Sequence, residues 1–274
     1  MRLPDGRLHL QHGPIDLICE AWGVDKAVHA AYARASRRFE TVLTELVSEL
    51  PILRAEDGRP SGAIGARMAR AVAPFRPAFI TPMAAVAGAV AETVLAEIAG
   101  PEIARAYVNN GGDIALHLAK AHSLTCAIAA PGGLPVTIGF SDPIRGIATS
   151  GWRGRSWSFG IADAVTVLAT SAAMADAAAT MIANAVNLPD HPGIVRQPAR
   201  ALQADSDLAD RLVTTAVPRL STCEIAVALD AGLVFAEALR ARGLIVAAAL
   251  FLQSEARVSG AIPLPYSLKE PVRV

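Results

Sequence analysis

The most informative apolar stretch of the chain lies within residues 162–187. Residues 164–169 (AVTVLA) are β-branched or small and apolar, which predicts a buried strand. Thr170 or Ser171 follows, and either hydroxyl can cap a helix by accepting a backbone N–H. The pattern therefore predicts a strand followed by a helix over residues 172–186.

Three polar side chains interrupt this apolar helix. Asp176, Thr180 and Asn184 are spaced four residues apart, so a helix places them along one stripe. An ionised carboxylate on an apolar helix is costly unless something pairs with it, which makes the stripe a candidate site. A structural interpretation stays open, in which Asp176 favours the helix dipole, Thr180 bonds its own backbone and Asn184 faces water.

Alternation and helical spacing also organise the N-terminal part. Residues 7–22 alternate on either side of a turn at residues 12–14, as in a half-buried hairpin. Residues 25–50 carry apolar side chains at three-to-four spacing and predict a long helix. Asp25 is its expected N-cap and Pro51 its stop.

A stretch rich in glycine and proline, residues 54–77, predicts a loop with one short helix near residues 67–72. Residues 84–98 predict a second helix of small residues, capped by Thr81. Gly88 lies inside that helix, where glycine costs about 1 kcal/mol relative to alanine. A close neighbour is expected there, either a packed helix or a ligand.

Short strands separated by turn residues fill the middle of the chain. Their spacing is typical of an antiparallel sheet. The expected strands are residues 104–108, 114–118, 124–129, 135–140, 146–149 and 157–161.

The C-terminal part returns to longer elements. Residues 188–207 predict a surface excursion, and residues 207–213 a short helix. Residues 225–242 predict a helix that ends before Gly243, a C-cap residue, and 244–252 a buried strand. The proline-broken residues 260–274 predict a loose tail.

These elements, without repeats, heptads or a clear linker, predict a single α+β domain over residues 1–274, with an antiparallel or mixed sheet flanked by helices. Apolar residues make up 53% and charged residues 18%, which excludes a disordered chain. Basic and acidic residues balance at 25 each, so the net charge gives no reason to expect nucleic-acid binding.

The cysteine spacing and the apolar runs limit the kinds of site and the location that the sequence suggests. The three cysteines are far apart and have no zinc-binding spacing, so we expect buried thiols in a reducing compartment. The N-terminus shows no signal-peptide pattern, and the longest apolar run near the end, residues 244–252, is too short to span a bilayer. A cytoplasmic protein without a membrane partner is the expectation, and its small-residue helices make a homodimer conceivable.

The first glycine-bearing loop reads NNGGD at residues 109–113. Asn110-Gly111 between alternating runs is a strong hairpin signal. In a functional interpretation, Gly111 and Gly112 let backbone N–H groups reach an anion or a ring edge, and Asp113 faces the same cavity.

The second such loop reads ATSGWRGR at residues 148–155. Thr149, Ser150, Gly151 and Arg153 combine small hydroxyls, glycine and a guanidinium, a set that suits phosphate or carboxylate binding. A β-turn with solvated arginines is an equal interpretation. The sequence holds no dinucleotide fingerprint, Walker loop, zinc-protease motif or nucleophile elbow.

Three segments in chain order resemble the ApbE flavin transferases. They are NGGDI at residues 110–114, ATSG at 148–151 and ADAAAT at 175–180, where that family carries a GGD turn, an ATSG strand end and an ADA-x-x-T helix. More closely, the chain resembles an uncharacterised group within the ApbE-like superfamily. HGPIDLICEA, ITPMAAVAGAVAE, YVNNGGDIALHL and RGIATSGWRGR carry that likeness over most of residues 12–250.

The resemblance implies a T-fold-like α+β architecture and a reaction in which FAD is cleaved, its FMN half joins a Thr or Ser of a partner protein and AMP leaves. It implies that Asp176 and Thr180 hold Mg²⁺, a cation usually bound by few protein ligands plus phosphates, and that Asp176 and Asp113 are catalytic. The residues implied to line the flavin nucleotide site are Met83, Asn110, Gly111, Gly112, Thr149, Ser150 and Gly151. To these we add Arg153 as a phosphate partner.

Two segments depart from the family pattern. A histidine-containing segment with an acidic-proline pair is replaced by SWSFGIAD, and a lysine-bearing helix by MAAVAGAVAE. Two hypotheses therefore stand: a Mg²⁺-dependent flavin or nucleotide transferase, or an accessory protein for a redox or sulfur-assimilation enzyme that keeps the pocket without transfer. A different small-molecule enzyme on the same scaffold is a third.

Overall fold

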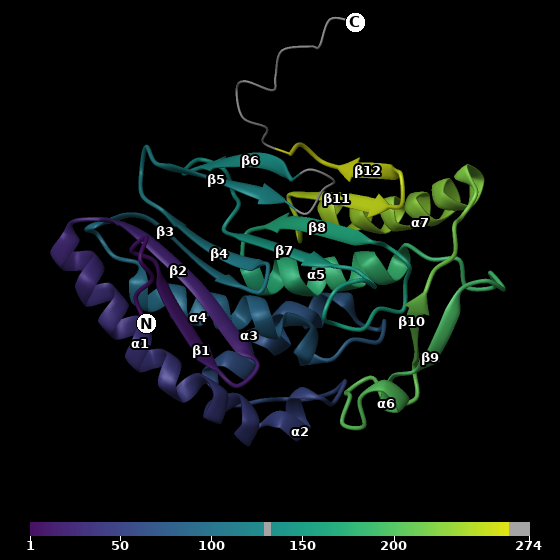
Figure 1. Cartoon of the computed structure of the whole chain (residues 1–274), viewed down its shortest axis with the longest axis horizontal. Coiled ribbons are helices and arrows are strands. Elements are labelled where there is room, and N and C mark those ends of the chain that lie inside the picture. The colour runs from purple at the N-terminus through teal and green to yellow at the C-terminus, as the bar shows by residue number, and fades with distance from the viewer. Residues whose placement is uncertain (129–132, 263–274) are drawn as a thin grey trace, which may run out of the picture.

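An antiparallel sheet of eight strands runs through the protein (Figure 1). The computed structural model describes residues 1–128 and 133–262. Every pairing in this sheet is antiparallel, as expected for short strands joined by tight turns. In spatial order the strands are β1 (Leu8–His12), β2 (Ile15–Gly23), β3 (Ile103–Asn110), β4 (Asp113–Leu118), β7 (Gly146–Ser150), β8 (Ala164–Ala169), β11 (Ala247–Leu252) and β12 (Glu255–Ser259).

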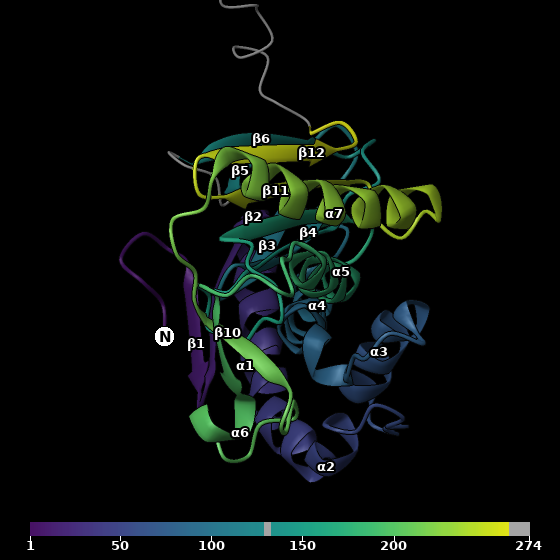
Figure 2. The ribbon, with the colours of Figure 1, turned by 90° about the vertical axis from the view of Figure 1, so that its right-hand side faces the viewer.

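Helices cover one face of the sheet, where α4 and α5 pack on its middle strands and α1 on its first two (Figures 1 and 2). The last long helix, α7, packs against α5, β11 and β12. The longer helices are α1 (Asp25–Ser48), α3 (Ala63–Val72), α4 (Val86–Ile98), α5 (Ala172–Ala185) and α7 (Thr222–Ala241). The short ones are α2 (Leu50–Leu53), η1 (Ala73–Phe75), η2 (Pro82–Ala85) and α6 (Ala199–Leu202).

The opposite face of the sheet is covered only in part, by a hairpin of β5 (Ser123–Ile128) and β6 (Leu134–Gly139). A second apolar cluster, separate from the main core under the helices, fills the space beneath this hairpin. It joins Leu124 and Ile138 of the hairpin to Ile147, Leu168 and Ala249 of the sheet. The outer face of β2 and β3 contributes only half-buried side chains to this cluster.

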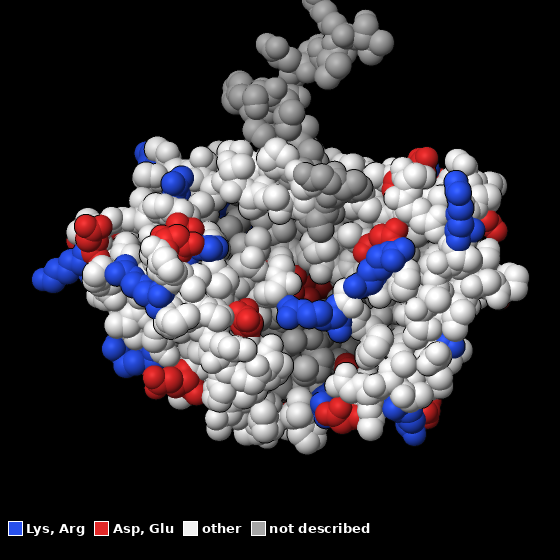
Figure 3. All heavy atoms as spheres, viewed as in Figure 1, with Lys and Arg blue, Asp and Glu red and all other residues white. Residues whose placement is uncertain are grey.

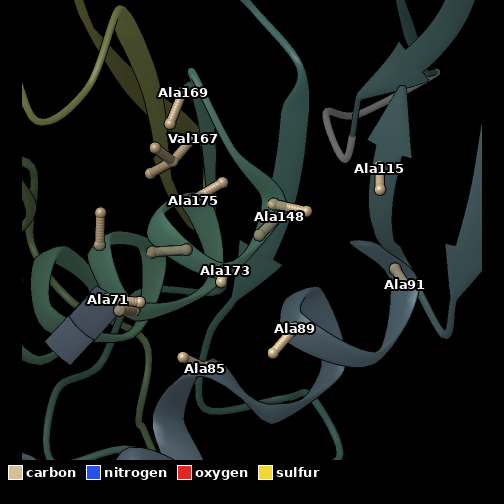
Figure 4. Packing of buried hydrophobic residues seen from close by; sticks show 14 of the residues in the cluster. Ala71, Ala85, Ala89, Ala91, Ala115, Ala148, Val167, Ala169, Ala173 and Ala175 are labelled. Carbon is tan, nitrogen blue, oxygen red and sulfur yellow. The ribbon is translucent and has the colours of Figure 1, made fainter. Parts of the chain in front are cut away.

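Small residues let α4 and α5 approach each other closely. A Cβ at Gly88 would lie 2.3 Å from the carbonyl oxygen of Ala172, so only glycine fits there. Figure 4 shows buried alanines from α4, α5 and the neighbouring strands meeting in this layer, Ala89, Ala148 and Ala173 among them. The neighbour expected at Gly88 is therefore a packed helix.

Each of these two helices also supplies an acid that caps the other. The Asp176 carboxylate accepts a hydrogen bond from the backbone N–H of Gly88 in the first turn of α4, at 3.0 Å. The Glu92 carboxylate accepts one from the backbone N–H of Ala173 in the first turn of α5, at 2.9 Å. Both helices thus gain an acceptor for N–H groups that lack an intrahelical partner.

Most predicted elements are confirmed, including the hairpin at residues 7–22 and the strand and helix at 164–186. The Ser171 hydroxyl accepts from the Met174 N–H, as a helix cap should. The predicted helix at 225–242 is α7, and Gly243 follows it with a φ of +71°. The short helix expected near 67–72 begins earlier, at Ala63.

Two predicted elements are wrong. Residues 157–161 form no strand, because the Asn184 side chain accepts from the Phe159 N–H and the Val186 carbonyl accepts from the Ile161 N–H. Residues 207–213 form no helix, since Leu212 opens β10 (Leu212–Ala216), which pairs with β9 (Val195–Pro198).

Three expected caps and breaks also differ. Val24, not Asp25, is the N-cap residue of α1, and α2 begins directly at Leu50, with Pro51 inside its first turn. Thr81 precedes η2 but donates its hydroxyl to the Asp207 carboxylate instead of capping.

The cysteines, the surface and the chain end complete this comparison. Cys19 is buried as expected, whereas Cys126 is half-buried and Cys223 is exposed on α7. The face in Figure 3 carries scattered acidic and basic side chains rather than a basic patch. Among the described residues, no helix has both the length and the apolarity to cross a bilayer. The expected loose tail falls largely on residues 263–274, outside the described residues.

Candidate functional site

Two cavities meet at Asp113 and Asp176. The first, here called the aromatic cavity, has a volume of about 270 Å³. The second, the glycine cavity, has a volume of about 530 Å³. Both are lined by Ala87, Asp113, Arg155, Ser156, Asp176 and Thr180.

The fold brings Asp113 to this junction through the tight turn before β4. Asn110 and Asp113 face each other across the β3–β4 hairpin, with Gly111 and Gly112 between them at φ values of +65° and +116°. The Asp113 carboxylate accepts from the Thr149 N–H at 3.2 Å, which ties the turn to β7. The hairpin interpretation of NNGGD is confirmed, and its aspartate lines both cavities.

Burial and mutual repulsion govern the charge of the two acids. Burial raises the pKa of Asp113 to about 7, although the Thr149 N–H and the Arg155 charge oppose the change. Burial, and then the charge of Asp113, raise the pKa of Asp176 well above its usual range despite the N–H groups of Gly88 and Ala87. Two half-buried carboxylates that repel each other would be stabilised by a cation between them.

The stripe predicted on α5 divides into two parts. Thr180 lies one helical turn after Asp176 and lines both cavities. Asn184 lines only the aromatic cavity, and its side-chain oxygen accepts from the Phe159 N–H at 2.9 Å and from the Ser158 hydroxyl at 3.1 Å. Asn184 therefore positions the segment after the second loop.

The second loop places a different arginine at the site from the one predicted. Arg153 bonds Asp163 at 2.6 Å, stacks over Trp152 at 4.5 Å and is not among the residues that line either cavity. Arg155 lines both cavities, and its guanidinium lies 3.4 Å from the Gly111 carbonyl oxygen. The prediction of Arg153 as the phosphate partner is wrong in its placement, because Asp163 neutralises that arginine.

The predicted glycine-loop residues line the glycine cavity, but several of their polar groups are already bonded. The Gly112 N–H donates to the Asn109 side chain at 2.8 Å, and the Asn110 amide donates to the Ala87 carbonyl at 3.1 Å. Thr149 shares its hydroxyl with Thr166 at 2.9 Å. Asn110, Gly111, Gly112, Thr149, Ser150 and Gly151 all line this cavity, and Met83 lines the aromatic one.

Sequence reasoning missed the aromatic wall. Phe79, Trp157 and Phe159 line the aromatic cavity, with the rings of Phe79 and Phe159 6.1 Å apart. Arg211, which directly precedes β10, stacks its guanidinium carbon 3.3 Å from the centre of the Phe79 ring. Aromatic residues make up only 5% of the chain, so the two aromatic side chains within the four residues SWSF could have indicated a binding wall.

The donor set at the junction fits a hard cation. Among residues 1–128 and 133–262, no group of three or more His, Cys, Asp or Glu side chains could hold a metal by itself. Asp113 and Asp176 nevertheless supply two carboxylates, Thr180 a hydroxyl, and no described salt bridge involves either acid. Mg²⁺ is commonly bound by one or two carboxylates together with substrate phosphates.

Comparison with known proteins gives the family. A family profile described as "AbpE bacteria" matches residues 1–258. The chain belongs to this family. The matched residues include those that line both cavities and every residue of the eight-stranded sheet except the last residue of β12.

Relatives of this family member carry names that state no activity. A UPF0280 protein of Methanopyrus kandleri is 36% identical over 174 residues, which are 63% of this chain and 67% of the relative. A UPF0280 protein of Methanothermobacter thermautotrophicus is 43% identical over 121 residues, 42% of this chain and 46% of the relative. For the second relative the match thus spans about half of its length.

Solved structures give more distant matches. The flavin transferase ApbE from Vibrio cholerae is 12% identical with a TM-score of 0.40, over 93% of this chain and 97% of that one. The flavinyl transferase ApbE of Pseudomonas stutzeri, in its apo form, is 15% identical with a TM-score of 0.38, over 88% and 74%.

Proposed function

We propose that this protein is a Mg²⁺-dependent transferase that binds a flavin dinucleotide and passes its FMN half to a hydroxyl group of a partner protein. The observation that carries the proposal is the half-buried pair Asp113 and Asp176, which lies where two cavities meet and has no described salt bridge. The two solved ApbE structures compared above are named as flavin or flavinyl transferases.

The two cavities differ in the parts of a dinucleotide that they suit. Phe79, Trp157 and Phe159 give the aromatic cavity flat apolar surfaces for a ring. Arg155, at the junction, presents a guanidinium to the phosphates. The Mg²⁺ held by Asp113, Asp176 and Thr180 would neutralise the pyrophosphate and its leaving group.

The reaction balances with the acceptor hydroxyl as the nucleophile. Its oxygen forms a bond to the flavin-side phosphorus, the bond from that phosphorus to the bridging oxygen breaks, and AMP leaves with the bridging oxygen. The hydroxyl proton passes to the oxygen of the Asp113 carboxylate that does not bind the cation; this carboxylate lines both cavities.

The test incubates the purified protein with FAD, Mg²⁺ and candidate flavoprotein partners. Release of AMP together with a flavin-linked partner, both lost on chelation with EDTA, is the expected result. Absence of both products with every partner would contradict the transferase.

One observation favours a second candidate, an accessory protein that binds a flavin or nucleotide without turnover. The SWSFGIAD segment places Trp157 and Phe159 on the cavity wall, which suits ring binding but adds no acid–base group there. Tight binding of FAD or ADP without AMP release would support this candidate.

A further inference from the structure

A third cavity, of about 560 Å³, lies on the outer face of the sheet beside the β5–β6 hairpin. Its floor is the outer face of β2, β3 and β4, and its side wall is β5. It shares Asn109, Ile114 and Ala127 with the glycine cavity, so the two cavities are neighbours. We call this cavity the edge groove. The lining residues used below are Glu20, Trp22, Arg105 and Tyr107 on its floor and Thr125 and Ala127 on its wall.

The wall of the edge groove is a strand edge without a pairing strand. In the β5–β6 hairpin Ala127 faces Pro135, which has no N–H. Ala127 and Pro135 are therefore a non-hydrogen-bonded pair of the antiparallel ladder. The hydrogen-bonded pairs are therefore the alternate ones, and they include Cys126 with Val136. The backbone N–H and C=O groups of Thr125 and Ala127 point away from β6, toward the groove.

A contact at the start of β5 supports this direction. The Ser123 carbonyl belongs to the same alternating set as Thr125 and Ala127, and it accepts from the Arg105 guanidinium on the groove floor at 3.0 Å. Within the described chain, β5 pairs with β6 alone. An open edge of this kind is a template for another extended chain.

The groove floor is built from interacting side chains. The Trp22 and Tyr107 rings lie 6.1 Å apart, and Arg105 stacks over Trp22 at 4.5 Å. The Tyr107 hydroxyl donates to the Glu20 carboxylate at 3.1 Å. Aromatic surface with both charges beside it suits the alternate side chains of an extended peptide.

We propose that the edge groove binds an extended segment of the acceptor protein as an added strand on β5. The proposal rests on the proposed function, because the neighbouring glycine cavity lies between one end of such a segment and the two acids, Asp113 and Asp176. A peptide fits better than a small planar ligand, since only a peptide can pair with the backbone groups of Thr125 and Ala127. Main-chain pairing supplies affinity, and the floor supplies selectivity.

The test screens a library of short synthetic peptides, each with a central threonine or serine, against the full chain with FAD and Mg²⁺. Binding is measured by fluorescence polarisation, and hydrogen exchange locates it. We expect bound peptides to slow exchange within residues 123–128. We expect Thr125→Pro to weaken binding about five- to tenfold, the effect of about one lost hydrogen bond.

Thr137→Pro is the matched control. Thr137 faces Thr125 across the hairpin, so its N–H points out from the opposite edge of β6 and its loss should leave peptide affinity unchanged. Thermal unfolding checks that both variants fold. Should Thr125→Pro fail to fold, Trp22→Ala on the groove floor decides, with an expected loss of similar size.

The docking surface and the transfer reaction fail in different ways. No binding peptide, protection outside residues 123–128, equal weakening by Thr137→Pro, or protection that appears only through dimerisation of the chain would overturn the docking surface. Peptide protection at β5 without AMP release would support the docking surface while contradicting the transferase.

Discussion

Asp176 on α5 and Glu92 on α4 have the same structural role, yet their surroundings differ. Each accepts a backbone N–H from the first turn of the other helix. Glu92 also lies 3.2 Å from the Arg67 guanidinium, so its charge is paired. Asp176 instead faces Asp113, and burial together with the charge of this second acid raises the pKa of Asp176.

This difference between Glu92 and Asp176 shows which acid is explained by the fold alone and which needs a functional explanation. A helix N-terminus explains why an acid stands at each position. It does not explain a second half-buried carboxylate beside the first, which opposes the stability of the cation-free fold. Glu92 is thus accounted for by capping, whereas the Asp113–Asp176 pair is accounted for by a bound cation.

The largest expected effect comes from Asp176→Asn. The amide oxygen still accepts from the Gly88 N–H, so the cap persists while the charge is lost. We expect AMP release to fall by about a thousandfold with little change in melting temperature. Glu92→Gln, the matched change at the other cap, should keep activity within a few-fold, and equal losses in both variants would show that capping alone matters.

Arg155→Ala is expected to come next in size. Removing the guanidinium at the junction should weaken binding of Mg²⁺–ADP by about ten- to a hundredfold, since charge-assisted phosphate contacts are strong. Arg153→Ala serves as its control, because that side chain is bonded to Asp163. Isothermal titration of both variants decides; a larger loss for Arg153→Ala would reverse the assignment.

Gly88→Ala tests the close approach that makes the reciprocal caps possible. The added Cβ would lie 2.3 Å from the Ala172 carbonyl oxygen, a backbone atom that cannot step aside. We expect a loss of about 1–3 kcal/mol in the free energy of unfolding, measured by urea denaturation. A Cβ at Gly100 meets nothing within 4 Å, so Gly100→Ala should be nearly neutral.

The smallest effect concerns pH. The pKa of Asp113 is raised to about 7 in the folded protein, so between pH 4 and 7 the folded state binds more protons than the unfolded state. Stability of the cation-free protein should therefore fall as pH rises through this range. Asp113→Asn should reduce the fall, by a few degrees in melting temperature between pH 4 and 7; an unchanged slope would contradict the raised pKa of this carboxylate.

Local signals were sufficient for much of the fold and part of the site. The β8–α5 unit, the Gly111-Gly112 turn and the Ser171 cap depend on neighbours in sequence, and each is confirmed. Contacts between distant residues could not be predicted in this way. The Asp176 cap joins residues 88 positions apart, and nothing local shows that Asp163 bonds Arg153 and leaves Arg155 at the cavity.

The segment at residues 157–161 shows the same limit. Its alternation is typical of a strand, but the Asn184 side chain takes the Phe159 N–H and holds the segment at the end of α5. That contact turns Trp157 and Phe159 into a cavity wall. A pattern of apolar residues cannot show which side chain will accept a backbone donor.

Calorimetric titration of ADP with and without Mg²⁺, into the unaltered protein and Asp176→Asn, tests the cation pair most directly. The pair predicts that Mg²⁺ strengthens ADP binding to the unaltered protein at least tenfold and has no effect on the variant. Identical enhancement by Mg²⁺ in both proteins would contradict it.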